Sequence, residues 1–174
     1  KEARSLSEKF NVFISINVSS QDLLSESFQR KVFQMIDELN IKPGMIMMEL
    51  TERQSADLNS LQKVISLFND KGISIAIDDF GTGYSNLNWL SSLQIDEIKI
   101  DKSITDSIDE YSISNNLLSG LVEIFKDITH KVVFEGVETS TQVNYLTEMF
   151  PECGVQGWYY SKPLSIDKLT KLVE

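Results

Sequence analysis

Short apolar runs alternate with longer amphipathic stretches along the whole chain, and this alternation constrains the fold more than any other feature. The runs with the length and composition of strands are residues 12–18, 45–50, 73–78, 97–100, 131–135 and 154–156. The stretches with helical periodicity are residues 21–40, 59–71, 84–93, 114–128, 139–149 and 166–173. Because parallel strands need long crossover connections, the alternation predicts an α/β fold with a parallel sheet. No internal linker or repeat interrupts the pattern, so we expect one domain over residues 1–174.

Each expected strand has one aliphatic face and one face that ends in a polar group, because successive side chains alternate across a strand. Five strands deliver a polar side chain from the same face, at or near the carboxyl end: Asn17, Glu49, Asp78, Lys99 and Glu135. In a TIM-type (β/α) barrel the aliphatic face packs on the helices, and active sites lie at the carboxyl rim. An open doubly wound sheet would bury these charges beneath a layer of helices. The parity therefore favours the barrel.

Converging carboxylates repel one another unless cations join them. An oxygen-rich cluster suits Mg²⁺ or Mn²⁺, whereas zinc more often brings histidine or cysteine ligands. His130 is the only histidine, which argues against a histidine-based metal cluster or nucleophile system. Cys153 is the only cysteine, so the chain cannot form an internal disulfide, and it suits a reducing compartment.

The chain is acidic, with a net charge of −10 from 26 acidic and 16 basic residues. This balance argues against DNA or RNA binding through a basic surface, because phosphate neutralisation needs clustered lysine and arginine. No apolar run approaches the roughly 18 residues of a membrane span, and no signal peptide opens the chain. We therefore expect a cytoplasmic location, with any membrane anchor of a parent protein lying in segments outside this chain.

The most specific string is DDFGTGYS at residues 78–85. Two adjacent carboxylates at a strand end can serve two cations, and Gly81 and Gly83 allow loop conformations that are closed to other residues. An Asp-Asp pair alone would more often be the capped start of a helix. The whole string is too specific for that interpretation.

This string resembles the loop that follows a strand in the EAL family of cyclic-di-GMP phosphodiesterases. Other family motifs recur in the same order and at similar spacing, at residues 15–19, 49–52, 99–101, 135–139, and 156–157 together with 162–164. The resemblance covers essentially all 174 residues. It implies metal-dependent hydrolysis of one phosphodiester of cyclic-di-GMP to linear pGpG, in signal transduction.

The resemblance also assigns roles to residues. It implies a two-metal site for Mg²⁺ or Mn²⁺ with ligands Asn17, Glu49, Asp78, Asp79 and Glu135. Lys99 would position or activate the attacking water, Glu52 would hold the Asp-Asp loop, and Gln156 would support the ligand shell. By the same resemblance we expect a possible homodimer and a sensor or GGDEF domain upstream in the parent protein.

The sequence departs from the family pattern in two places. Phe134 stands where the family usually has alanine, and its outward parity predicts a change of packing only. The Glu-Ala-Leu segment is absent, and about six of the eight expected strands are present. We therefore expect an N-terminally truncated domain that hydrolyses cyclic-di-GMP more slowly than a chain extended upstream.

Simpler interpretations remain for single residues and for the whole chain. Lys99 could be a structural lysine paired with Asp78 or Glu49, and we interpret the aromatic run at residues 158–160 as core and rim packing. The chain could also be a non-catalytic cyclic-di-GMP receptor, or a protein-interaction module on the same fold. Metal-dependent turnover separates the enzyme from the receptor, and ligand binding separates the receptor from the module.

Overall fold

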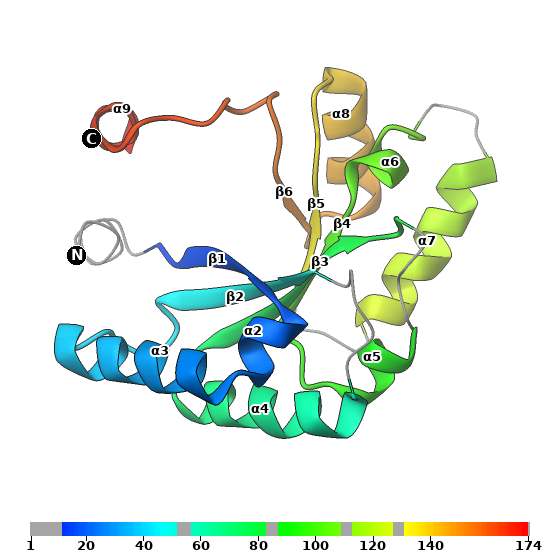
Figure 1. Ribbon diagram of the computed structural model, residues 1–174. Coiled ribbons are helices and arrows are strands. Elements are labelled where there is room, and N and C mark those ends of the chain that lie inside the picture. The colour runs from blue at the N-terminus through cyan, green and yellow to red at the C-terminus, as the bar shows by residue number, and fades with distance from the viewer. Residues whose placement is uncertain (1–11, 52–56, 83–86, 109–112, 127–130, 174) are drawn as a thin grey trace. The chain divides into compact units, whose positions relative to one another are not determined.

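Six strands form one sheet in chain order, β1-β2-β3-β4-β5-β6 (Figure 1). The computed structural model describes residues 12–51, 57–82, 87–108, 113–126 and 131–173. The strands are β1 (Ile14–Ser19), β2 (Ile46–Thr51), β3 (Ser74–Phe80), β4 (Glu97–Ile100), β5 (Lys131–Phe134) and β6 (Gly154–Val155). β1 pairs with β2 in parallel, as do β4 with β5 and β5 with β6. The six predicted strands are confirmed, with boundaries that shift by one to two residues.

Helices occupy the connections between the strands. They are α2 (Ser20–Leu24), α3 (Glu26–Leu39), α4 (Leu58–Asp70), α5 (Leu87–Ser92), α6 (Lys102–Thr105), α7 (Ile113–Lys126), α8 (Ser140–Met149) and α9 (Ile166–Val173). None of the described helices is long and apolar enough to cross a bilayer.

Two helical features differ from the sequence prediction. The predicted helix over residues 21–40 is broken at Ser25, whose backbone is extended with φ −75° and ψ 113°. The short helix α2 before this break begins with a capping box, in which Ser19 and Asp22 satisfy each other's backbone amides. Helix α6 was not predicted; it begins at Asp101, whose carboxylate accepts a hydrogen bond from the Ser103 amide at 2.9 Å.

The chain divides into two compact units. Within the described residues, the first holds residues 12–76, 87–94 and 165–173, and the second holds 77–82 and 95–164, each with the gaps given above. The prediction of a single domain over the whole chain stays a prediction.

In the first unit, α2 and α4 contact each other and contribute fully buried side chains. Those side chains are Leu23 of α2 and Leu61, Ile65 and Phe68 of α4. Phe33 of α3 joins them, with its ring centroid 5.0 Å from that of Phe68. The apolar faces of these helices thus explain their formation, since burial of an amphipathic face provides most helical stability in proteins.

In the second unit, aromatic pairs link the strands to the helices that follow them. Phe80 at the end of β3 meets Phe125 of α7 edge to face, with ring centroids 4.8 Å apart. Phe134 of β5 is fully buried and stacks on Phe150 beside α8 at 5.6 Å. This contact agrees with the predicted outward direction of Phe134 and anchors the strand that precedes Glu135.

Candidate metal centre

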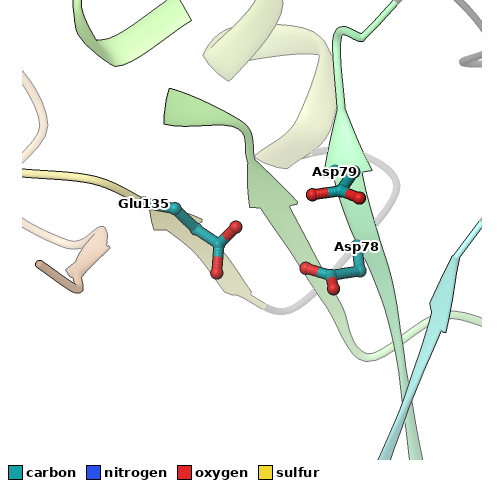
Figure 2. A group of neighbouring side chains, drawn as sticks. All are labelled: Asp78, Asp79 and Glu135. Atoms are coloured by element: carbon teal, nitrogen blue, oxygen red, sulfur yellow. The ribbon is translucent and has the colours of Figure 1, made fainter. Parts of the chain in front are cut away.

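Three carboxylates meet at the ends of β3 and β5, all within the second unit. Asp78 and Asp79 lie near the end of β3, and Glu135 directly follows β5. One oxygen from each lies within 4.8 Å of the others, and Figure 2 shows Asp78 directed toward Glu135. Strand parity alone predicts that Asp78 and Glu135 share a face, and the structure brings these two side chains together.

Asp79 joins the cluster because the backbone breaks the strand alternation there. Side chains of adjacent strand residues point to opposite faces, so Asp78 and Asp79 should diverge. Asp79 instead has a φ of 56°, in the left-handed region that aspartate tolerates better than most residues. The turn is held by Thr82, whose amide and hydroxyl donate to the Asp79 carbonyl at 3.3 and 3.1 Å. A strained residue held in this way is typical of functional sites.

Backbone hydrogen bonds beyond the strand ends fix neighbouring parts of the site. The Asp101 amide donates to the Phe80 carbonyl at 3.1 Å, and the Glu135 amide donates to the Ile100 carbonyl at 3.0 Å. The ends of β3, β4 and β5 are thereby tied together in sequence. Side chains that leave these ends start from a fixed backbone, as preorganised sites require.

Lys99 of β4 links two members of the cluster. Its Nζ lies 3.2 Å from Asp78 Oδ1 and 2.6 Å from Glu135 Oε1, and its side chain is only 5% exposed. The pairing with Asp78 was one alternative for Lys99; Glu135 is its second partner. Asp78 Oδ1 is buried and, among the described residues, receives no hydrogen bond, so its contact with Lys99 is an ion pair without hydrogen-bond geometry. That oxygen keeps lone pairs available for a cation.

The other predicted ligands lie in the first unit. Asn17 of β1 is the parallel register partner of Glu49 of β2, so both side chains leave the same face of that strand pair. Glu49 is buried, whereas Asn17 is exposed on the edge strand. Glu52, predicted to hold the Asp-Asp loop, lies outside the described residues.

Gln156 follows β6 and lies beside Glu135. Its amide donates to the Phe134 carbonyl at 2.8 Å, and its carbonyl accepts from the Val137 amide at 3.1 Å. Its side chain and that of Glu135 line the same pocket, which has a volume of about 480 Å³. The structure thus places Gln156 next to a predicted ligand, as a supporting role requires.

The loop after Glu135 is anchored by residues that were not predicted as part of the site. Lys102 Nζ lies 2.6 Å from Glu138 Oε1, and this hydrogen bond raises the pKa of Lys102. The buried Gln142 side chain accepts from the Glu138 and Thr139 amides at 2.8 and 3.0 Å, and donates to the Thr105 carbonyl at 3.2 Å. The capping-box spacing of Thr139 and Gln142 was the available sequence signal for this anchor.

The aromatic run after β6 corrects one sequence interpretation. Core and rim packing was expected for Trp158, Tyr159 and Tyr160, but their exposed fractions are 60, 47 and 57%. Each is therefore a surface residue. The nearby backbone turn, described below, holds them there.

The donor set fits a hard divalent cation. The cluster offers three carboxylates, and one buried oxygen of Asp78 lacks a hydrogen bond among the described residues. Carboxylate oxygens are the ligands that Mg²⁺ and Mn²⁺ prefer. Asp78, Asp79 and Glu135 could therefore hold such an ion.

These features define an α/β protein with an acidic cation site at the carboxyl ends of parallel strands. A family model of the EAL domain matches residues 1–163, and the chain belongs to this family.

Individual relatives agree with that membership. The chain is 40% identical over 161 residues to the probable cyclic di-GMP phosphodiesterase PdeB of Escherichia coli, covering 92% of this chain and 30% of PdeB. The chain thus spans about a third of the length of the curated relatives it matches.

Solved structures show the same fold. The EAL domain of Mycobacterium smegmatis DcpA matches with a TM-score of 0.89 at 27% identity, over 99% of this chain and 79% of that one. The manganese and cy-diGMP complex of Klebsiella pneumoniae BlrP1 matches with a TM-score of 0.79 at 26% identity, over 92% of this chain and 42% of that one. With the parallel six-stranded sheet, these similarities confirm the predicted α/β fold class of the TIM-type barrel.

Proposed function

We propose that this chain is a cyclic-di-GMP phosphodiesterase domain that hydrolyses one phosphodiester of the messenger to give linear pGpG. The observation that carries the proposal is the meeting of Asp78, Asp79 and Glu135 around Lys99 in a member of the EAL family. The name of PdeB and the ligand in the BlrP1 complex support the choice of substrate.

The cluster residues are the cation ligands in this proposal. Asp78, Asp79 and Glu135 would hold Mg²⁺ or Mn²⁺, and Asn17 and Glu49 would complete a two-metal ligand set. When bound, such ions lower the pKa of water and neutralise charge on phosphoryl oxygens. The manganese in the BlrP1 complex supports the choice of cation.

The chain's own residues bind and orient the reactants. In hydrolysis a water oxygen forms a bond to phosphorus, the bond from phosphorus to one ribose oxygen breaks, and that oxygen takes a proton. The Lys99 ammonium lies among the carboxylates, where it can donate a hydrogen bond to the attacking water or to a phosphoryl oxygen. Gln156 would orient the ligand shell beside Glu135, and Glu52 would hold the Asp-Asp loop.

The partners and location of the chain belong to the same proposal. A homodimer and a covalently linked sensor or GGDEF domain would suit a signalling enzyme, and the greater length of relatives such as PdeB supports a multidomain protein. A cytoplasmic location would give the domain access to cyclic-di-GMP.

The test measures pGpG formation from cyclic-di-GMP by chromatography, with Mg²⁺, with Mn²⁺ and with a chelator. It is run on this chain and, because the relatives are longer, on the full-length protein. We expect metal-dependent turnover that Asp79→Asn abolishes and that the matched substitution Asp70→Asn, at an exposed position on α4, leaves intact. Binding without turnover would make the protein a receptor, and absence of both would make it an interaction module.

A further inference from the structure

The pocket beside Glu135 extends well beyond the metal cluster. Its volume of about 480 Å³ lies within the range of small-molecule sites. Glu135 and Gly136 form one part of its wall, the segment from Gln156 to Pro163 forms another, and Lys102 contributes from α6. Because Glu135 belongs to both the cluster and the pocket, one ligand can occupy the two together.

Trp158 is the main aromatic surface of this pocket, and a rigid turn presents it. The Val137 amide donates to the Gln156 carbonyl at 3.1 Å, and the Tyr159 amide donates to the Val137 carbonyl at 3.0 Å. Gly157 lies so close to the Val137 backbone that a Cβ atom would collide with it. The exposed indole therefore stands on a turn that is locked to the loop following Glu135, and little order would be lost on binding.

Two lysines give the pocket the charge that a phosphorylated ligand requires. Lys102 and Lys162 both line it, and Lys162 Nζ lies 5.0 Å from the centroid of the Trp158 ring. An aromatic face beside flexible cations is typical of sites that stack a nucleobase and contact its phosphate. A purely apolar partner would leave both lysines without a role.

We propose that Trp158 stacks against a guanine base of the substrate while the adjoining phosphate lies at the carboxylate cluster. This inference rests on the proposed function and adds a substrate-positioning surface to it. Base stacking is stronger than a cation–π contact at an exposed site, so the base displaces the Lys162 ammonium from the indole face. Lys162 is then available to a phosphate oxygen. Trp158 in this account sets affinity and orientation and leaves the chemical step to the cluster.

The chain offers a direct optical test, because it has two tryptophans of opposite exposure. Trp89 is only 5% exposed, against 60% for Trp158, so an external quencher reports mainly on Trp158. The metal-free protein is titrated with 5′-GMP. We expect quenched emission and reduced access of acrylamide to the indole, and we expect Trp158→Phe to remove both changes.

Affinities measured by calorimetry complete the design. Trp158→Ala should weaken 5′-GMP binding by about tenfold, whereas Trp158→Phe, which keeps a ring, should weaken it by no more than about threefold. Ribose 5-phosphate, which has no base, should bind the two variants and the parent protein equally. Tyr160→Ala is the matched control, because Tyr160 is exposed in the same turn but does not line the pocket.

The outcomes separate this inference from the proposed function. Optical quenching and loss of affinity in Trp158→Ala, without any cyclic-di-GMP turnover, would uphold the stacking surface and overturn the enzyme assignment. Turnover with no response of Trp158 to 5′-GMP would overturn the stacking surface alone. If Trp158→Ala fails to fold by circular dichroism, the quenching of the parent protein and its loss in Trp158→Phe decide the matter.

Discussion

The strand ends of β1 and β2 and those of β3 to β5 display polar groups by the same parity, but they treat charge differently. In the first region an exposed amide, Asn17, is the register partner of a buried carboxylate, Glu49. In the second region three carboxylates surround a buried ammonium, Lys99. Parity therefore selects the face, and additional features, including the left-handed φ at Asp79, gather the charges.

The second region carries an excess of negative charge that needs a cation. Three carboxylates and one ammonium give the cluster a formal charge of −2 when all are ionised. Two like charges 4 Å apart repel by about 1 kcal/mol in water and by about 4 kcal/mol at an effective dielectric constant of 20. A divalent ion at this position would offset that repulsion. The first region, with a neutral amide beside its carboxylate, has a weaker need of this kind.

The largest expected effect tests whether the two regions serve one metal site. Asp78→Asn and Glu49→Gln should each lower metal-dependent hydrolysis of cyclic-di-GMP by more than about 10²-fold, since even residues that only support a ligand cost 10- to 100-fold. The measurement is initial rate against Mn²⁺ concentration. Near-normal turnover in Glu49→Gln alone would confine the metal site to the ends of β3 to β5.

Glu97→Gln is the matched control for both variants. Glu97 is a buried glutamate at the start of β4, where it pairs with Lys131 at 2.8 Å and lies outside the carboxylate cluster. Its substitution should affect thermal stability and leave the dependence of the rate on Mn²⁺ unchanged. A fall in Mn²⁺ affinity as large as that of Asp78→Asn would show that the effect is not specific to the cluster.

The second prediction removes the cation that distinguishes the two regions. Lys99→Met leaves Asp78 and Glu135 without their buried partner, and breaking such a pair costs about 3–5 kcal/mol. The metal-free variant should melt about 10 °C lower, because 1 kcal/mol corresponds to about 2–4 °C at this size. Mn²⁺ should bind about tenfold more tightly and restore more of the Tm than in the parent protein, although turnover is lost.

Lys131→Met provides the comparison, because it breaks an ion pair at the opposite ends of the same two strands. This variant should also melt at a lower temperature, but Mn²⁺ should stabilise it no more than it stabilises the parent protein. An unchanged Mn²⁺ affinity in Lys99→Met would mean that the lysine does not compete with the ion.

Strand positions and polar ends follow from the sequence because both depend on local alternation. Asp78 and Glu135 could be assigned to one face from parity alone, and the structure brings them together. The left-handed conformation of Asp79 could not be predicted, because it depends on the turn and on packing against other segments. The break at Ser25 and the exposure of Trp158 also depend on tertiary contacts, which a periodic pattern does not contain.

The smallest expected effect compares the aspartates that begin a helix in each region, Asp57 before α4 and Asp101 before α6. Hydrogen bonds from the Ser60 hydroxyl and amide lower the pKa of Asp57, and Asp57 is fully exposed. Burial acts to raise the pKa of Asp101, but hydrogen bonds from Ser103 outweigh it, so that pKa is also lowered.

A folded pKa below the unfolded value means that the unfolded chain binds more protons, so each carboxylate stabilises the fold above its unfolded pKa, near 3.8. This contribution is lost as the pH falls through the lower, folded pKa. Asp57→Asn keeps a cap oxygen and removes the titration. Its Tm should lie below that of the parent protein by no more than about 2 °C at pH 7, and the gap should close at acid pH. Asp101→Asn should show the same direction. Melting curves at several pH values between 7 and 3 make the test, and a gap that stays constant with pH would show that the carboxylate charge does not contribute to these caps.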